Sequence, residues 1–404
     1  MERLNVRSYT WLNGSTSLSW VYVMERLGAA FEELGHNFYP ISTNGFNNSF
    51  FSKEKMLNSA LSLQGFGPSK KQIDIDLTYT VPSNFSKRFL SNSKTKCAIY
   101  NYETWSEDGG WPSAWKNFYN LVDYYFPSSN FSAEVFALNG VPAEKIFVIP
   151  HGIDTKVFNP NIEPIKLNTN KKFKFCSIVA PHYRKNIDLL LEAFCEAFTN
   201  KDDVCLVLKT KAYKHSDGMY DAVKNPKGRQ GFEIVLGDIL KPLYNKYGKN
   251  IPEIILLNSY VDNISSIYNA CDCHITTTGA EGFGLPLMES MACGLLSIAP
   301  KYSGQLDFMN DNNSLLIDTD LRLAKRTEQY WNYNPKSKIG QPRKEHIIKL
   351  MKKVVWEKEQ LLEKFKPEMD KVIKEYSWIN AAQKIIDATQ GKMEHYKIGT
   401  YKLK

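Results

Sequence analysis

Short apolar runs alternate with amphipathic segments along most of the chain, and this alternation limits the fold more than any other feature of the sequence. Apolar residues recur three and four positions apart in segments such as Leu18 to Phe31 and Ile187 to Ala197, which predicts helices that bury one face. Strands that alternate with helices form parallel sheets covered by helices, so the predicted fold class is α/β. The runs that we expect to form strands are Gln72 to Thr80, Lys96 to Tyr102, Tyr124 to Pro127, Lys145 to Pro150, Phe173 to Ala180, Val204 to Thr210, Glu253 to Asn258, Cys273 to Thr278 and Leu295 to Ala299.

A linker divides these strands into two series. The chain has 404 residues, enough for two domains, and the segment Asn159 to Lys172 carries two prolines and four asparagines with little periodicity. We therefore expect an N-terminal domain over residues 1–165 and a C-terminal domain over residues 170–374. A second irregular stretch, Asn332 to Lys344, precedes two helical segments, which are Ile347 to Phe365 and Trp378 to Thr389.

Composition narrows the class of protein. Hydrophobic residues make up 43% and charged residues 23% of the chain, which excludes disorder over most of its length. We find no run of about 18 apolar residues and no signal-peptide pattern in the first thirty positions, so we expect a cytoplasmic protein without a membrane span. The seven cysteines are scattered, which favours free thiols. Cys271, Cys273 and His274 lack a second ligand pair, so we expect no metal site there.

The most informative segment runs from Gly279 to Gly294. It follows a predicted strand, passes through the glycine-containing turn Gly282, Phe283, Gly284 and Leu285, and opens a helix in which Pro286 suits the first position. Glycines let the backbone approach a ligand closely, and the N–H groups and dipole at a helix N-terminus attract an anion. This segment therefore predicts a phosphate site.

Two glutamates lie on either side of that turn. We place Glu289 in the first turn of the helix, where its carboxylate can accept hydrogen bonds from the hydroxyls of a ribose, and Glu281 before the turn, so that the two acids reach opposite ends of one ligand. Taken alone, the two acids fit solvated helix caps better. The glycines between them favour the ligand site instead.

Further charged residues follow other predicted strands. Arg184 and Lys185 follow the strand Phe173 to Ala180 and could neutralise a diphosphate, because ligands collect at the carboxyl ends of strands in open α/β sheets. Exposed charges at a helix start are an equally good interpretation. Glu103 also follows a strand, and for it we weigh a functional acid against a solvated loop acid.

Two other segments leave alternatives open. The turn around Gly14 could let a substrate approach the backbone or could be only a tight loop, and it lacks the G-x-G-x-x-G pattern of a dinucleotide site. The region Lys209 to Arg229 is basic and could grip the phosphates of a polymer, although a solvated loop is the commoner meaning. The net charge of +8 fits a phosphate-bearing ligand, an anionic membrane surface or nucleic acid, and does not choose among them.

Together these residues resemble the retaining glycosyltransferases of family 4. Glu281 and Glu289 match both acids of that family's E-x7-E signature, and the segments Pro127 to Phe136, Val148 to Asp154 and Ile267 to Asp272 are similar to further family segments. The resemblance implies the GT-B fold, in which two Rossmann-like domains face each other across a deep cleft. It also implies that the last helix, within residues 375–404, crosses back onto the first domain.

The resemblance also implies roles for the site residues. Glu289 would hold the donor ribose, Glu281 would contact the transferred sugar, and Lys185 with Arg184 would bind the diphosphate. The amides of Phe283, Gly284 and Leu285 would lie near the phosphates or the sugar. The chain departs from the family pattern at two places, because Val179-Ala180 stands where many members carry glycine-arginine and Gly304-Gln305 stands where a double glycine is frequent.

The function that we expect is therefore metal-independent transfer of a hexose or pentose from a nucleotide-diphosphate sugar to an acceptor hydroxyl, with retention and without a cofactor. The acceptor would be a surface or lipid-linked glycan, with peripheral membrane contact left open. Glycosylation of hydroxymethylated bases in phage DNA is an alternative, because a basic chain fits either partner. A non-catalytic scaffold that binds sugar nucleotides is a second alternative.

Overall fold

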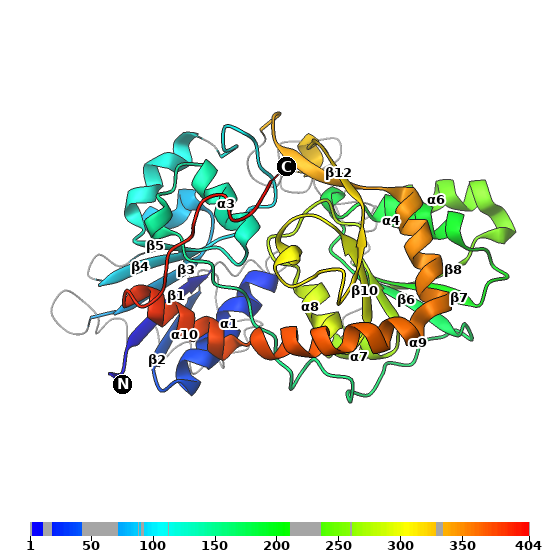
Figure 1. Ribbon diagram of the computed structural model, residues 1–404, viewed down its shortest axis with the longest axis horizontal. Coiled ribbons are helices and arrows are strands. Elements are labelled where there is room, and N and C mark those ends of the chain that lie inside the picture. Colours follow the sequence, from blue (N-terminus) through cyan, green and yellow to red (C-terminus); the bar gives the residue numbers. More distant parts are fainter. Residues whose placement is uncertain are drawn as a thin grey trace. The chain divides into compact units, whose positions relative to one another are not determined.

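The computed structural model describes residues 2–10, 18–42, 72–87, 89, 93–111, 113–210, 236–258, 261–328 and 334–403. The chain forms two compact units. Unit 1 comprises Met1–Tyr102, Glu107–Gly152 and Tyr376–Lys404, and unit 2 comprises Glu103–Ser106 and Ile153–Glu375. Each unit contains its own parallel sheet (Figure 1).

Unit 1 is built on a five-stranded sheet of order β2-β1-β3-β4-β5, in which every neighbouring pair is parallel. Its α-helices include α1, which leads from β1 to β2, and α10, which packs against α1. The bounds are β1 Asn5–Thr10, α1 Leu18–Glu33, β2 Asn37–Ser42, β3 Ile75–Tyr79, β4 Thr95–Ile99, β5 Tyr124–Phe126, α3 Asn130–Leu138 and α10 Trp378–Thr389.

Unit 2 is built on a six-stranded parallel sheet of order β11-β10-β9-β6-β7-β8, with a separate antiparallel pair β12-β13. The strands are β6 Phe173–Ile178, β7 Val204–Lys209, β8 Glu253–Leu257, β9 Cys273–Ile275, β10 Leu296–Pro300, β11 Leu315–Ile317, β12 Thr319–Leu323 and β13 Lys338–Pro342. The helices are α4 Ile187–Ala197, α6 Leu236–Tyr247, α7 Ser265–Asn269, α8 Leu285–Ala292 and α9 Lys344–Glu375.

The predicted apolar runs fit strands of parallel sheets, because helices cover the faces of such sheets and bury the side chains on both. Every residue of β3 and of β10 is buried, as are the first five residues of β7. The first five residues of β7 are all apolar, as expected for a strand covered on both faces, whereas β3 also buries Asp76 and Thr78. Most of the predicted runs coincide with strands, and the helices expected around Leu18 to Phe31 and Ile187 to Ala197 are confirmed as α1 and α4.

Two expectations about local structure are wrong. Residues 145–150 do not form a strand, because this segment pairs with β5 only through the single bridge between Tyr125 and Ile146. The stretch 332–344, expected to be irregular, contains β13, which pairs with β12 and has few of the β-branched residues on which strand prediction relies.

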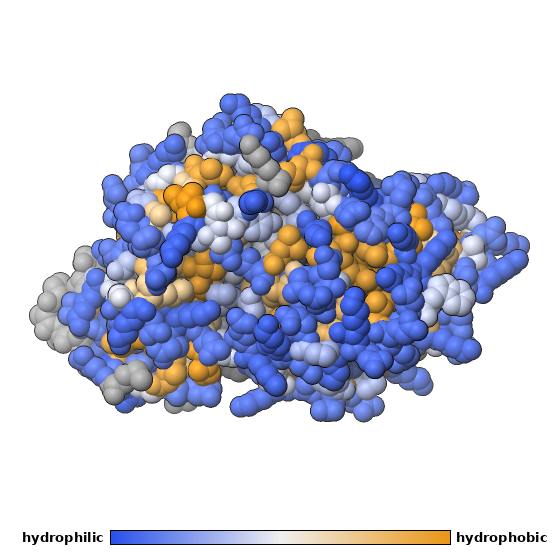
Figure 2. Space-filling view, viewed as in Figure 1, coloured by the Kyte–Doolittle hydropathy of each residue, from blue (hydrophilic) through white to orange (hydrophobic). Residues whose placement is uncertain are grey.

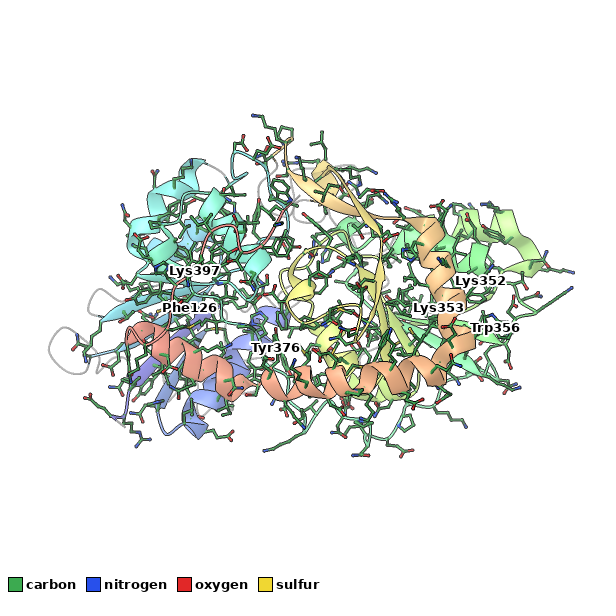
Figure 3. The ribbon with its side chains drawn as sticks, in the orientation of Figure 1. Phe126, Lys352, Lys353, Trp356, Tyr376 and Lys397 are labelled. Carbon is green, nitrogen blue, oxygen red and sulfur yellow. The ribbon has the colours of Figure 1, made fainter. Side chains whose placement is uncertain are left out.

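α9 is longer than its apolar pattern indicates, whereas α10 spans the predicted residues Trp378 to Thr389. α9 runs from Lys344 to Glu375, and it bends at Glu357, whose φ of −113° and ψ of 17° are not helical. Trp356, labelled in Figure 3 near Lys352 and Lys353, precedes this bend and is 85% exposed. Tyr376, labelled in the same figure, is the first residue of the returning segment of unit 1.

The hydropathy of the surface (Figure 2) and the burial of the cysteines are those of an ordinary globular protein. The surface is mostly hydrophilic along the later part of α9 (Figure 2). All seven cysteines are free thiols, and six of them are buried. Among the described residues, no helix combines the length and the apolar character that crossing a membrane requires.

Candidate active site

Charged side chains meet at the carboxyl edge of the unit 2 sheet, where β6 and β9 are neighbours. Arg184 and Lys185 lie in a short 3-10 helix, Tyr183–Lys185, that follows β6, and Glu281 follows β9. Lys185 Nζ forms an ion pair with Glu281 Oε1, and Arg184 Nη1 lies 3.6 Å from Glu281 Oε2. Residues almost a hundred positions apart meet because parallel strands end at the same sheet edge.

The turn that precedes Glu281 holds both the side chain and the backbone of Arg184. Its guanidinium donates a hydrogen bond to the carbonyl of Ala280, and its own carbonyl accepts one from the N–H of Gly279 at 2.7 Å. Its Nη2 also donates to Glu103 Oε1 at 3.2 Å. The side chain of Arg184 is only 7% exposed, so the guanidinium is held in one place with carboxylates on two sides.

Asn186 completes the loop that presents these cations. It is one of two described non-glycine residues with a positive φ, at φ 48° and ψ 45°, a left-handed conformation that asparagine tolerates better than most residues. Its Nδ2 donates to the carbonyl of Thr277 at 3.0 Å, and Thr277 Oγ1 donates to the carbonyl of Asn186 at 2.9 Å. These reciprocal bonds hold the loop after β6 against the segment after β9.

Electrostatics keeps Glu281 ionised. Burial alone would raise the pKa of its carboxyl group, but the charges of Lys185 and Arg184 outweigh burial and lower that pKa below its usual value. Burial lowers the pKa of Lys185, while Glu281 opposes that shift. The site is thus a compact group of two cations with the carboxylates of Glu281 and Glu103.

The loop from Ser303 to Gln305, to which sequence analysis gave no role, holds the backbone of Glu281. The N–H of Glu281 donates to Ser303 Oγ at 2.8 Å, and the N–H of Gly304 donates to the Glu281 carbonyl at 2.9 Å. Ser303 Oγ in turn donates to Gln305 Oε1 at 2.9 Å, and Gln305 is fully buried. Gln305, which departs from the family's frequent double glycine, therefore supports the site from inside.

The glycine-containing turn leads from Glu281 into α8. Gly284 has a φ of +100° and directly precedes the helix, and a side chain would be strained in that conformation. Gly282 and Phe283 are buried, and the Phe283 ring packs 5.1 Å from the ring of Phe308, so only the backbone of Phe283 is suited to face a ligand. The helix begins at Leu285, which makes Pro286 its second residue rather than its first.

Glu289 lies deeper in α8 than expected. It is the fifth residue of the helix, beyond the first turn, because the helix starts at Leu285. A hydrogen bond from Tyr268 Oη to Glu289 Oε2 at 3.0 Å, rather than the helix terminus, holds its carboxylate, and Tyr268 Oη also lies 3.1 Å from the carbonyl of Pro286. Burial raises the pKa of Glu289 to about 7, although the bond from Tyr268 opposes the shift.

The structure thus brings Glu281, Lys185, Arg184 and Glu103 together and gives Glu289 a separate buried partner. Gly14 lies outside the described residues, and of the basic region Lys209 to Arg229 only the first two residues are described. In the described part of the chain, no group of three or more histidine, cysteine, aspartate or glutamate side chains is arranged to hold a metal ion. Tyr268, Ser303 and Gln305 support these residues, a role that sequence analysis did not assign to them.

Comparison with known proteins relates the segment that carries these residues to a family. Residues 159–332 match the family described as glycosyl transferases group 1. The chain is similar to a probable sucrose-phosphate synthase of Thermosipho melanesiensis, at 25% identity over 172 residues that cover 42% of this chain and 35% of that protein. The match thus spans about a third of the relative's length, given its 35% coverage.

Two solved structures resemble the whole chain. A glycosyltransferase from Rickettsia africae superposes with a TM-score of 0.64 at 16% identity, over 96% of this chain and 98% of that one. HepE of Anabaena in complex with UDP superposes with a TM-score of 0.61 at 13% identity, over 96% of this chain and 100% of that one. The fold is therefore the GT-B fold.

The chain thus has the GT-B fold, and its residues 159–332 match the glycosyl transferases group 1 family. This matched segment contains Arg184, Lys185, Glu281 and Glu289.

Proposed function

We propose that the protein is a retaining glycosyltransferase of family 4, which moves a sugar from a nucleotide-diphosphate donor to an acceptor hydroxyl. The observation that carries the proposal is the group formed by Lys185, Arg184 and Glu281 directly before the N-terminus of α8. Two cations beside a helix N-terminus suit a diphosphate, and an ionised carboxylate among them suits the hydroxyls of a sugar.

The donor would extend from Glu281 to Glu289. In this arrangement Glu281 and Glu289 are the two acids of the E-x7-E signature. The carboxylate of Glu289, held by Tyr268, accepts hydrogen bonds from the ribose hydroxyls, and Glu281 accepts hydrogen bonds from the transferred sugar. Arg184 and Lys185 bind the diphosphate between them. The structure of HepE with UDP supports uridine diphosphate as the first nucleotide to try.

Transfer would proceed on one face of the donor sugar. The acceptor oxygen forms a bond to the anomeric carbon as the bond from that carbon to the diphosphate oxygen breaks, and the acceptor proton passes to the leaving diphosphate. The charge that develops on the leaving group is stabilised by Arg184, Lys185 and the N-terminus of α8. Because these groups supply positive charge, we propose that the reaction needs no metal ion.

For the acceptor we propose a surface or lipid-linked glycan. The alternative acceptor is a DNA base, and a measurement of DNA binding tests it. Binding to DNA through phosphates weakens steeply with salt, because each neutralised phosphate releases counterions. We expect no binding to single-stranded or duplex DNA at about 50 mM salt, where such contacts are strong. Binding whose salt dependence flattens after charge reversal at Lys224, Lys227 and Arg229 would favour the DNA acceptor.

A screen of nucleotide sugars tests the proposed activity. The purified protein is incubated with uridine, guanosine, adenosine and thymidine diphosphate sugars, and release of the nucleoside diphosphate is measured with and without candidate glycan acceptors. We expect release from at least one donor, and loss of that release in Glu281→Ala. A protein that binds a nucleotide sugar but releases nothing under any of these conditions would instead be the non-catalytic scaffold.

A further inference from the structure

Four residues that are flanked on both sides by residues of unit 1 belong to unit 2. The segment Glu103–Ser106, which we call the arm, is part of unit 2, whereas the residues on both sides of it, up to Tyr102 and from Glu107, belong to unit 1. The arm follows β4 by a few residues. Its contacts lie with β13 and with the residues of the candidate active site.

Trp105 anchors the arm. Its backbone pairs with Lys338 of β13 in an isolated antiparallel bridge, with the Lys338 N–H donating to the Trp105 carbonyl at 2.6 Å. Its indole Nε1 donates to Tyr302 Oη at 2.9 Å, and Lys338 Nζ lies 4.9 Å from the ring centroid. Trp105 is only 2% exposed, and Asn334 Nδ2 donates to Ser106 Oγ at 3.2 Å. The arm is therefore held by buried contacts on both sides of its tryptophan.

The strand that holds the arm is itself fixed to the turn before Glu281. The N–H of Gly340 in β13 donates to the carbonyl of Gly279 at 2.9 Å, and the N–H of Gly279 donates to the carbonyl of Arg184. A Cβ atom at Gly340 would lie 2.8 Å from that Gly279 carbonyl oxygen, so the close approach requires glycine. A continuous set of backbone bonds thus leads from the arm through β13 to Arg184.

Trp105 also connects the arm to the loop that holds Glu281. Its partner Tyr302 directly precedes Ser303, whose hydroxyl accepts the N–H of Glu281. The arm therefore contacts both of the structures that position the charged group, namely the turn before Glu281 through β13 and the Ser303 loop through Tyr302.

Glu103 is the arm's contribution to the charged group. Its Oε1 accepts a hydrogen bond from Arg184 Nη2 at 3.2 Å, and its side chain is 31% exposed. On the other side of the same guanidinium, Nη1 lies 3.6 Å from Glu281 Oε2. Two carboxylates therefore compete for one arginine. Without the negative charge of Glu103, Arg184 would be drawn toward Glu281 and away from its present orientation.

We propose that Glu103 is a positioning residue that acts through Arg184, and that Trp105 holds it in place. Glu103 keeps the guanidinium oriented to receive the donor diphosphate and stops it from pairing fully with Glu281. This inference rests on the proposed function, since it assigns the diphosphate to Arg184. Glu103 would therefore act through the orientation of Arg184.

A double-mutant cycle tests the proposal. Binding of the nucleoside diphosphate that the wild-type protein binds most tightly, with uridine diphosphate tried first, is measured by calorimetry for the wild type, Glu103→Gln, Arg184→Ala and the double variant. We expect Glu103→Gln to weaken binding about fivefold to tenfold, because a partly exposed charged hydrogen bond is lost. In the Arg184→Ala background the same change should weaken binding by less than about twofold, because the residue through which Glu103 acts is absent.

Two outcomes overturn the proposal, and they are distinguishable. If the two effects are additive, Glu103 does not act through Arg184 and the positioning role is wrong, while the proposed function stands. If the wild-type protein binds no nucleoside diphosphate, the proposed function is wrong and this inference fails with it. Thermal unfolding of each variant shows whether weaker binding reflects a loss of folded protein.

A second set of variants tests the anchor. Trp105→Phe and Tyr302→Phe each remove the same hydrogen bond from one side, so we expect each to weaken nucleotide binding about threefold and the double variant to be no weaker than either. Trp111→Phe is the matched control, because its buried indole N–H donates to no partner among the described residues. Wild-type affinity in both anchor variants would contradict the role of Trp105.

Discussion

The ammonium group of Lys185 forms an ion pair with Glu281, and both side chains are only 14% exposed. Each carries a charge that the other stabilises in the absence of a donor, and a donor would offer new partners to both: a diphosphate to the lysine and sugar hydroxyls to the glutamate. The loop after β6 and the turn before α8 hold the two side chains in place. Each side chain could therefore exchange its present partner for a group of the donor without a large movement.

Removing either member of this pair should reduce catalysis. We expect Lys185→Ala and Glu281→Ala each to lower kcat/KM about 100-fold or more, because a preorganised charge contact to the transition state is lost. Steady-state release of the nucleoside diphosphate measures the effect. Lys358→Ala is the matched control, since its ion pair with Asp272 at 2.7 Å lies in the same unit but away from the site. Near-wild-type rates in both site variants would contradict the assignment.

Glu289 should make donor binding depend on pH. Its pKa is raised to about 7 by burial, so the carboxylate to which we assign the ribose is lost as the pH falls through 7. We expect the donor KM to rise below pH 7 with little change in kcat, and Glu289→Gln to have a high KM that no longer varies over that range. Tyr268→Phe removes a hydrogen bond that lowers this pKa, so the midpoint should move to higher pH. A KM independent of pH in the wild type would contradict this role.

Chelation of metal ions should leave the reaction largely intact. In the proposed diphosphate site, Arg184 and Lys185 supply the positive charge together with the N-terminus of α8, so we expect the site to need no divalent cation. We expect turnover in saturating EDTA to stay within about twofold of the untreated rate, a limit well below the loss expected from removing a charge contact at the transition state. Complete loss that Mg²⁺ restores would show that the phosphate site is misplaced.

The C-terminal tail should stabilise unit 1 through Glu134. Glu134 Oε2 in α3 accepts hydrogen bonds from Tyr396 Oη at 2.6 Å and from the N–H of Gly399 at 2.7 Å, and Glu134 is only 6% exposed. We expect Glu134→Gln to lower the free energy of unfolding by about 1–2 kcal/mol, measured in urea, because a charged acceptor is replaced by a neutral one. Glu144→Gln, at an exposed position of the same unit, serves as the control. Equal stability of the two variants would contradict the role of the tail.

Much of the fold could be predicted because the strands and helices leave patterns of apolar residues and glycines over short stretches of the sequence. Continuous apolar runs such as Val204 to Leu208 form buried strands of a parallel sheet, and the glycine at position 284 marks the start of α8. Lys185 and Glu281 could be placed together because both follow strands of one parallel sheet, and residues after such strands collect at one edge.

The remaining parts depend on contacts that no local pattern records. The bridge between Trp105 and Lys338 joins residues far apart in the chain, and β13 is recognisable only once its partner β12 is known. The sequence predicts Glu289 in the first helical turn, whereas it lies beyond that turn, because an error of one residue at the helix start decides its position. Its hydrogen bond from Tyr268 arises from the packing of α7 against α8.

The anomeric configuration of the product tests the central claim most directly. The donor identified by the nucleotide-sugar screen is incubated with the wild-type protein and its acceptor, and NMR compares the anomeric configuration of the new glycosidic bond with that of the sugar in the donor. The account predicts the same configuration in donor and product, with the product formed at the same rate as the nucleoside diphosphate and strongly slowed in Glu281→Ala. An inverted product, or transfer at a near-wild-type rate in Glu281→Ala, would contradict it.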